Sequence, residues 1–153
     1  AKSSAASDVY KRQLQAMATA PVKTAEILAQ VAHSLTDITG FGLGGHAARM
    51  AFAAGLSAHI DSAAVPLYSG AETLAANGIA STIAPANRAA LGVAMPDTAR
   101  AALLVDPQTA GGFLAAIPPD ALRTTIASLI DAGATATQIG HLTPWSDHPI
   151  VVT

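Results

Sequence analysis

Apolar residues recur with a helical period in several parts of the chain. The clearest case is the segment 119–132, where Leu122, Ile126, Leu129 and Ile130 share one face. A proline opens this segment and Gly133 follows it, as is usual at the two ends of a helix. Similar patterns predict further helices at 21–32, 43–54, 66–76 and 86–91.

Shorter apolar or alternating runs lie between these helices and predict strands. The segment "SAHID" (57–61) alternates like a half-buried strand. Other candidates lie at 34–39, 81–84, 102–105, 113–117, 137–142 and 150–152. Helices and strands do not alternate strictly, and the chain closes with a hairpin-like pair of strands. The pattern therefore predicts an α+β fold with a mixed or antiparallel sheet flanked by helices.

Composition limits the function classes. The 153 residues suffice for one domain, and 51% of them are apolar. The net charge is −2 and the basic residues are spread thinly, so no nucleic-acid partner is expected. The absence of cysteine excludes disulfides and a thiol nucleophile within these residues. The longest apolar stretch, 47–56, is too short to span a membrane, and no secretory signal is visible, so we expect a cytoplasmic protein.

The first 20 residues are polar and rich in small side chains. They lack a persistent apolar period, which predicts a disordered lead or a foreign junction outside the fold. The folded domain is then expected to be 21–153. The chain begins without Met, and we interpret the sequence as a fragment of a longer protein.

Residues 36–46, "TDITGFGLGGH", contain the spacing Gly40-x-Gly42-x-x-Gly45, and Asp61 follows about 20 residues on. This combination fits a dinucleotide-binding (Rossmann-type) module. The first strand of such a module is a nearly continuous apolar run, because both of its faces are buried. Here the strand carries the charged residue Asp37 shortly before the loop, which counts against this interpretation.

A magnesium–phosphate site explains Asp37 better. Its charge would repel a pyrophosphate by roughly 4 kcal/mol at about 4 Å. A helix N-terminus offsets only about 0.3–1 kcal/mol of this. A divalent cation bound between the Asp37 carboxylate and the phosphate would replace this repulsion with attraction to both groups. The glycines would then let the backbone N–H groups of the following helix approach the phosphates. The alternative is that Asp37 only caps the turn, and both possibilities stay open here.

Several stretches together resemble one family. "TDITGFGLGGH" resembles the "T-D-[VI]-T-G-F-G-L-x-G-H" signature of the selenide, water dikinases, or selenophosphate synthetases. "DPQTAGGFLAAIP" (106–118) is similar to the family's "D-P-Q-T-S-G-G-L-L" motif. "GLSAHID", "AVPLYSGAETLAANGIAST", "PANRAAL" and "IGHLTP" resemble further stretches in the same order. The resemblance runs over 21–144 and covers only the C-terminal half of such an enzyme.

The resemblance implies a fold like the C-terminal domain of the aminoimidazole ribonucleotide synthetase superfamily. It also implies that the intact protein is an ATP-dependent phosphotransferase, which converts ATP, selenide and water into selenophosphate, AMP and phosphate with Mg²⁺. A missing N-terminal ATP-binding domain would carry the nucleophile, so this fragment alone would hold no catalytic residue and be inactive. The intact enzyme would be a cytoplasmic homodimer.

The same resemblance assigns the site residues. Asp37 corresponds to a magnesium ligand of the family, and Thr36, Thr39, Gly40 and Gly42 to the loop around it. The second motif is expected near the inter-domain cleft through Asp106, Gln108, Thr109, Gly111 and Gly112. Two positions depart from the family pattern: Gly44 replaces a bulkier residue and Ala110 replaces a serine.

Other polar residues have plainer explanations. We expect His46 to pack against the strand rather than to bind metal, and Arg88 to be solvated or ion-paired rather than to contact phosphate. We expect Asp61 to cap a turn. The remaining histidines show no zinc-site spacing: His33, His59, His141 and His148.

Overall fold

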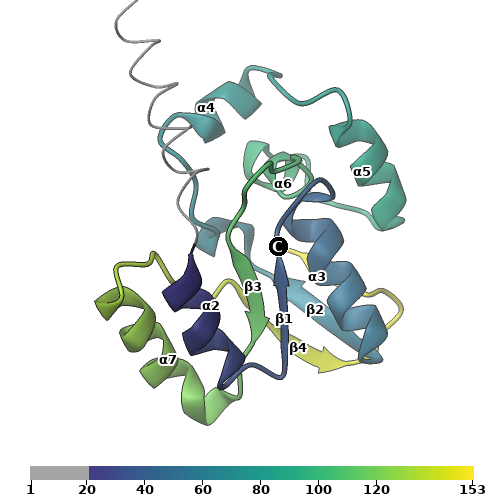
Figure 1. Cartoon of the computed structure of the whole chain (residues 1–153). Helices are drawn as coiled ribbons and strands as arrows, with labels where there is room; N and C mark the ends of the chain where they lie inside the picture. The colour runs from purple at the N-terminus through teal and green to yellow at the C-terminus, as the bar shows by residue number, and fades with distance from the viewer. Residues whose placement is uncertain (1–20) are drawn as a thin grey trace, which may run out of the picture.

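The computed structural model describes residues 21–153. The prediction for residues 1–20 lies outside the described residues. A first sheet pairs β1 (Ser34–Asp37) with β3 (Phe113–Ala116) in antiparallel register, with Asp37 opposite Phe113. Helices α2 (Val22–Ala29) and α7 (Pro119–Asp131) pack together beside this sheet (Figure 1).

A second sheet has three strands in the order β4, β2, β5, with bounds Gly140–Pro144, Leu56–Ile60 and Ile150–Val152. The central strand β2 is antiparallel to β4 and parallel to β5. The predicted α+β class with mixed and antiparallel pairing is therefore confirmed. The predicted hairpin-like close is wrong, because β4 and β5 lie on opposite sides of β2 and do not pair with each other.

Helix α3 (Gly42–Ala53) joins the two sheets and packs on the second one. Its buried face consists of alanines, Ala47, Ala48 and Ala51, which let the helix approach the sheet closely. They share one core cluster with Ala58, Ile60, Ile150 and Val152. The periodicity that predicted this helix is thus the periodicity of its core contacts.

The middle of the chain forms short helices: η1 (Ser62–Ala64), α4 (Ala71–Ala76), α5 (Ala84–Leu91) and α6 (Ala99–Leu103). Arg100, on α6, links this helix to η1 and α4. Its guanidinium donates hydrogen bonds to the carbonyl oxygens of Ser62, Ala63 and Val65, and pairs with Glu72 at 2.8 Å. No helix between residues 21 and 153 is long and apolar enough to cross a membrane.

The predicted strand at 102–105 is wrong, because these residues form the end of α6 and the turn after it. The Thr98 hydroxyl accepts the Ala101 N–H at 3.2 Å and so caps this helix. Ala101 and Leu104, three residues apart, are both buried, as a helical face requires.

Other boundaries also differ from prediction, and α2 and β1 end at Ala29 and Asp37, two or three residues earlier than expected. Residues 81–84 form no strand, because α5 begins at Ala84 and Pro85 occupies its first turn. The helix predicted at 66–76 begins only at Ala71, after Gly70 in a left-handed conformation with φ 87°. Strand β4 starts at Gly140, later than predicted.

Candidate functional site

The two motifs lie against each other. Beyond Asp37 and Phe113, the Ile38 N–H donates to the Gly112 carbonyl at 2.9 Å and the Gly111 N–H to the Ile38 carbonyl at 3.1 Å. The Gln108 N–H donates to the Thr39 carbonyl at 3.1 Å. We call residues 36–42 and 106–112 the paired loops. Their backbones form one continuous surface, although they are far apart in the sequence.

Close backbone approach explains two of the glycines. Gly42 has φ 70°, and a Cβ there would lie 2.7 Å from the Leu104 carbonyl oxygen and 2.9 Å from that of Asp106. A Cβ on Gly111 would overlap the Ile38 carbonyl oxygen. Gly42 therefore seats the start of α3 on residues 104–106, and Gly111 seats the second loop on the first.

The backbone N–H groups of two loop glycines are already used within the protein. The Gly42 N–H donates to the Thr39 carbonyl at 3.0 Å, and the Gly44 N–H to the Leu104 carbonyl at 2.8 Å. A phosphate contact from this loop stays a prediction, and it would have to involve other groups than these two.

The dinucleotide alternative is not supported. Strand β1 lies in a two-stranded antiparallel sheet, whereas that module needs a parallel sheet with the loop glycines open to the ligand. A Cβ on Gly45 would lie 2.7 Å from the Phe41 Cβ, so this glycine also serves internal packing. The Asp61 carboxylate accepts the Ala63 N–H at 2.9 Å and caps η1, which confirms its predicted turn-capping role.

Asp37 is the last residue of β1 and is exposed. It lines an open hollow of about 510 Å³ together with Leu35, Thr36, Gly111 and Phe113. Within residues 21–153 no group donates a hydrogen bond to its carboxylate, so Asp37 does not cap the turn there. Carboxylate oxygens are preferred ligands of Mg²⁺, and Asp37 brings two of them to the rim of the hollow.

The hollow would give a metal ion only part of its ligand set. Among residues 21–153 no three His, Asp or Glu side chains come together in a way that could hold a metal ion. Asp106, in the second loop, accepts a hydrogen bond from the Gln108 side chain at 3.2 Å. The remaining predicted residues of that loop, Thr109 and Gly112, are exposed.

His46 holds the first loop. Its Nε2 lies 3.1 Å from the Thr39 backbone nitrogen and 3.0 Å from the Thr39 hydroxyl oxygen. Because Nε2 accepts the backbone N–H, the ring proton of the neutral side chain is on Nδ1. Its place beside β1 agrees with the expected structural role. Arg88 forms no ion pair within residues 21–153. It donates instead to the carbonyl oxygens of Met95 and Pro96 at 3.2 and 3.5 Å.

Sequence reasoning missed Asn87, the neighbour of Arg88. Its side-chain amide donates to the Gly40 carbonyl at 2.8 Å and to the Val105 carbonyl at 3.0 Å. One side chain on α5 thus bonds to the first loop and to the residue just before the second. The motif "PANRAAL" contained the residue that could have indicated this contact, because the side-chain amide of Asn87 has two N–H donors that can bond to backbone carbonyls.

The fold and the paired loops define an α+β domain with mixed and antiparallel sheets. The family of the AIR synthase related protein, C-terminal domain, matches residues 3–152, and the chain belongs to this family. Its relatives include selenide, water dikinases, which confirms the resemblance seen in the two motifs.

Three of these relatives show the extent of the similarity. The selenide, water dikinase of Burkholderia pseudomallei (strain K96243) is 43% identical over 107 residues, which are 66% of this chain and 30% of that protein. That of Pseudomonas straminea is 40% identical over 116 residues, 72% of this chain and 32% of that protein. That of Geobacter metallireducens (strain ATCC 53774 / DSM 7210 / GS-15) is 36% identical over 125 residues, which are 79% of this chain and 36% of that protein. The chain spans about a third of the length of these curated relatives.

Proposed function

We propose that this chain is the C-terminal part of a selenophosphate synthetase, in which ATP, selenide and water yield selenophosphate, AMP and phosphate. The observation that carries the proposal is the contact between the two motifs. Both resemble family signatures, and the hydrogen bonds of Ile38 and Gly111 join them beside the exposed carboxylate of Asp37. An N-terminal ATP-binding domain would supply the rest of the site, since the similar proteins are about three times as long as the matched region.

In this proposal Asp37 provides one ligand to Mg²⁺. The fit rests on a carboxylate that is exposed on the rim of an open hollow and accepts no hydrogen bond from residues 21–153. A bound Mg²⁺ would neutralise charge on the phosphoryl oxygens of ATP. The chain itself fixes where the carboxylate stands, because the β1–β3 pairing holds Asp37 opposite Phe113.

The paired loops form the floor of the proposed phosphate cleft. Thr36, Gly40 and Thr39 would lie on the side of Asp37. Asp106, Gln108, Thr109, Gly111 and Gly112 would lie near the cleft between the two domains, with Gly111 lining the same hollow as Asp37. Gly42 acts from beneath by seating α3 on residues 104–106. By resemblance to the family, the intact protein would be a cytoplasmic homodimer, and selenide would reach the cleft from the N-terminal part.

The substitution Asp37→Asn in the full-length protein tests the metal role. It removes the charge but keeps the size and position of the side chain. We expect selenophosphate formation, measured by ³¹P NMR, to fall by at least about a hundredfold, since even indirect disturbance of metal ligands costs about 10–100-fold. Circular dichroism should show an unchanged fold, because the carboxylate is exposed at the end of β1.

Asp120→Asn is the matched control. Asp120 is an exposed carboxylate in the first turn of α7. Helix α7 follows the C-terminal end of β3, whereas Asp37 pairs with Phe113 at the other end of that strand. This variant should keep the activity of the unaltered protein. Near-normal activity of Asp37→Asn, or an equal loss in both variants, would contradict the proposed metal role.

A further inference from the structure

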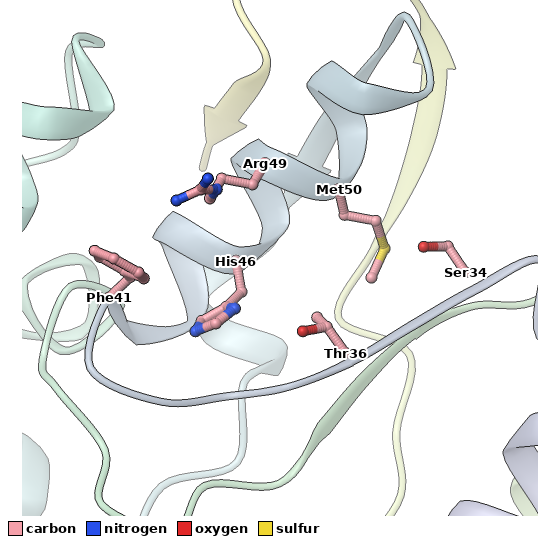
Figure 2. A pocket seen from close by; sticks show the side chains of 6 residues that line it. All are labelled: Ser34, Thr36, Phe41, His46, Arg49 and Met50. Atoms are coloured by element: carbon pink, nitrogen blue, oxygen red, sulfur yellow. The ribbon is translucent and has the colours of Figure 1, made fainter.

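A second hollow, of about 320 Å³, lies between β1 and α3. Figure 2 shows its walls: Ser34 and Thr36 on the strand side, Phe41 at the loop, and His46, Arg49 and Met50 on the helix. Successive side chains of a strand point to opposite faces. Ser34 and Thr36 therefore face α3, and Leu35 and Asp37 face the other hollow, although Thr36 also contributes to the lining of that other hollow. Strand β1 separates the two.

Three of the polar side chains of this second hollow, those of Ser34, His46 and Arg49, can act as donors, whereas the Thr36 hydroxyl already donates to the Asp37 carbonyl at 3.1 Å. Among the described residues that line it, Arg49 alone is charged and no carboxylate is present. Within residues 21–153 no carboxylate forms an ion pair with Arg49. His46 uses Nε2 as an acceptor toward Thr39, which leaves Nδ1–H as its donor. The hydroxyl of Ser34 adds a further donor.

Phe41 holds the arginine in place without neutralising it. The Arg49 guanidinium carbon lies 5.6 Å from the centroid of the Phe41 ring. The other aromatic neighbour, His46, meets the same ring edge-on at 5.9 Å. A ring can orient a guanidinium through its π face while leaving the N–H groups of the arginine available. The hollow therefore combines a positioned positive charge with hydroxyl and imidazole donors.

We propose that this second hollow binds a tetrahedral oxyanion of the phosphate type, either free phosphate or the phosphoryl group of a nucleotide. Arg49 is its charged ligand, and Ser34 and His46 add uncharged donors. A planar guanidinium matches the oxygens of such an anion in a bidentate way. The lining residues explain why the hollow would prefer an anionic ligand. That this anion is a phosphate rests on the function proposed above. The hollow would keep a reactant or product next to the Asp37 site, across one strand.

Direct binding tests this proposal. Inorganic phosphate and, separately, AMP are titrated into the full-length protein by calorimetry, with a chelator present so that no Mg²⁺ held by Asp37 contributes. Arg49→Gln removes the charge and keeps a polar side chain of similar reach. We expect it to weaken binding about tenfold or more, as for a lost charge-assisted contact. Ser34→Ala should weaken it about threefold.

Arg123→Gln is the matched control, because Arg123 is exposed on α7 and does not line the hollow. It should leave both affinities within about twofold, since a remote surface charge is screened. Arg49→Lys keeps the positive charge but loses the planar guanidinium that can bind an anion through two N–H groups. We therefore expect its affinity to lie between those of the unaltered protein and of Arg49→Gln. This variant also provides a test should Arg49→Gln unfold.

The outcomes separate the two sources of the anion. AMP binding that Arg49→Gln weakens about tenfold or more assigns the hollow to a nucleotide phosphoryl group, and phosphate binding with the same loss assigns it to free phosphate. Two results would overturn the proposal: no saturable binding of either ligand at millimolar concentration, or equal weakening by Arg49→Gln and Arg123→Gln. Because no turnover is measured, this result is independent of the Asp37→Asn assay.

Discussion

At the scale of single residues, the glycines of the first motif explain why it has its spacing. Gly42 combines a left-handed φ of 70° with backbone oxygens closer than any Cβ could tolerate. Gly45 faces the Cβ of Phe41, the residue whose ring holds Arg49. Two of the three glycines in a spacing typical of phosphate-binding loops are thus required by contacts of the protein with itself, whereas a Cβ on Gly40 would meet no heavy atom within 4 Å. Spacing alone could not distinguish these two causes.

Gly42→Ala should be markedly destabilising. A left-handed φ costs a non-glycine residue about 1–3 kcal/mol, and the new methyl group would also press on the backbone at Leu104 and Asp106. We expect a loss of about 2–5 kcal/mol in the free energy of unfolding, measured by urea unfolding with circular dichroism. Gly92→Ala separates the two effects, because Gly92 has φ 64° and a Cβ added there would meet no heavy atom within 4 Å. Equal losses in both variants would show that the close approach contributes nothing.

At the scale of elements, periodicity predicted the long helices and the short apolar runs predicted β2, β3 and β5 to within one residue, whereas the segments 81–84 and 102–105 were predicted wrongly. Helices α3 and α7 have apolar faces of several turns, so their periodicity identified them correctly. The run 102–105 is too short for a period to distinguish a helix from a strand. Thr98, which caps α6, was the informative residue. The helix predicted at 86–91 begins two residues earlier, because Pro85 lies inside the first turn of α5.

The link between α5 and the paired loops gives a second stability prediction. Asn87→Ala removes both donors and leaves the buried Val105 carbonyl without its partner, at a cost of about 1–3 kcal/mol. Asn87→Asp should cost more, because a carboxylate would face two carbonyl oxygens. Urea unfolding measures both changes.

Asn77→Ala is the control for this pair of variants. The Asn77 amide donates only to the exposed Thr73 carbonyl at 2.9 Å, so its loss should cost less than about 1 kcal/mol. If Asn87→Ala proves no more harmful than Asn77→Ala, the amide does not fasten the loops together.

At the scale of the whole molecule, the sequence predicted the two loops but not their contact. The positions of Asp37 and of the second motif followed from the resemblance, and the mixed α+β class from the pattern of elements. The register that sets Asp37 opposite Phe113 depends on long-range pairing between distant strands, which a local pattern does not encode. The role of Asn87 and the second hollow, too, arise only once α5, α3 and β1 have come together.

In the function proposed here, the Asp37 carboxylate ligates the metal ion of a nucleotide site, and the rest of the full-length protein supplies the other ligands. The most direct measurement is a crystal structure of the full-length protein with Mg²⁺ and a non-hydrolysable ATP analogue. We predict a carboxylate oxygen of Asp37 at about 2.1 Å from Mg²⁺, with the other ligands supplied by phosphate, water and the N-terminal part. An occupied metal–nucleotide site whose ions all lie beyond the reach of Asp37 would contradict the account.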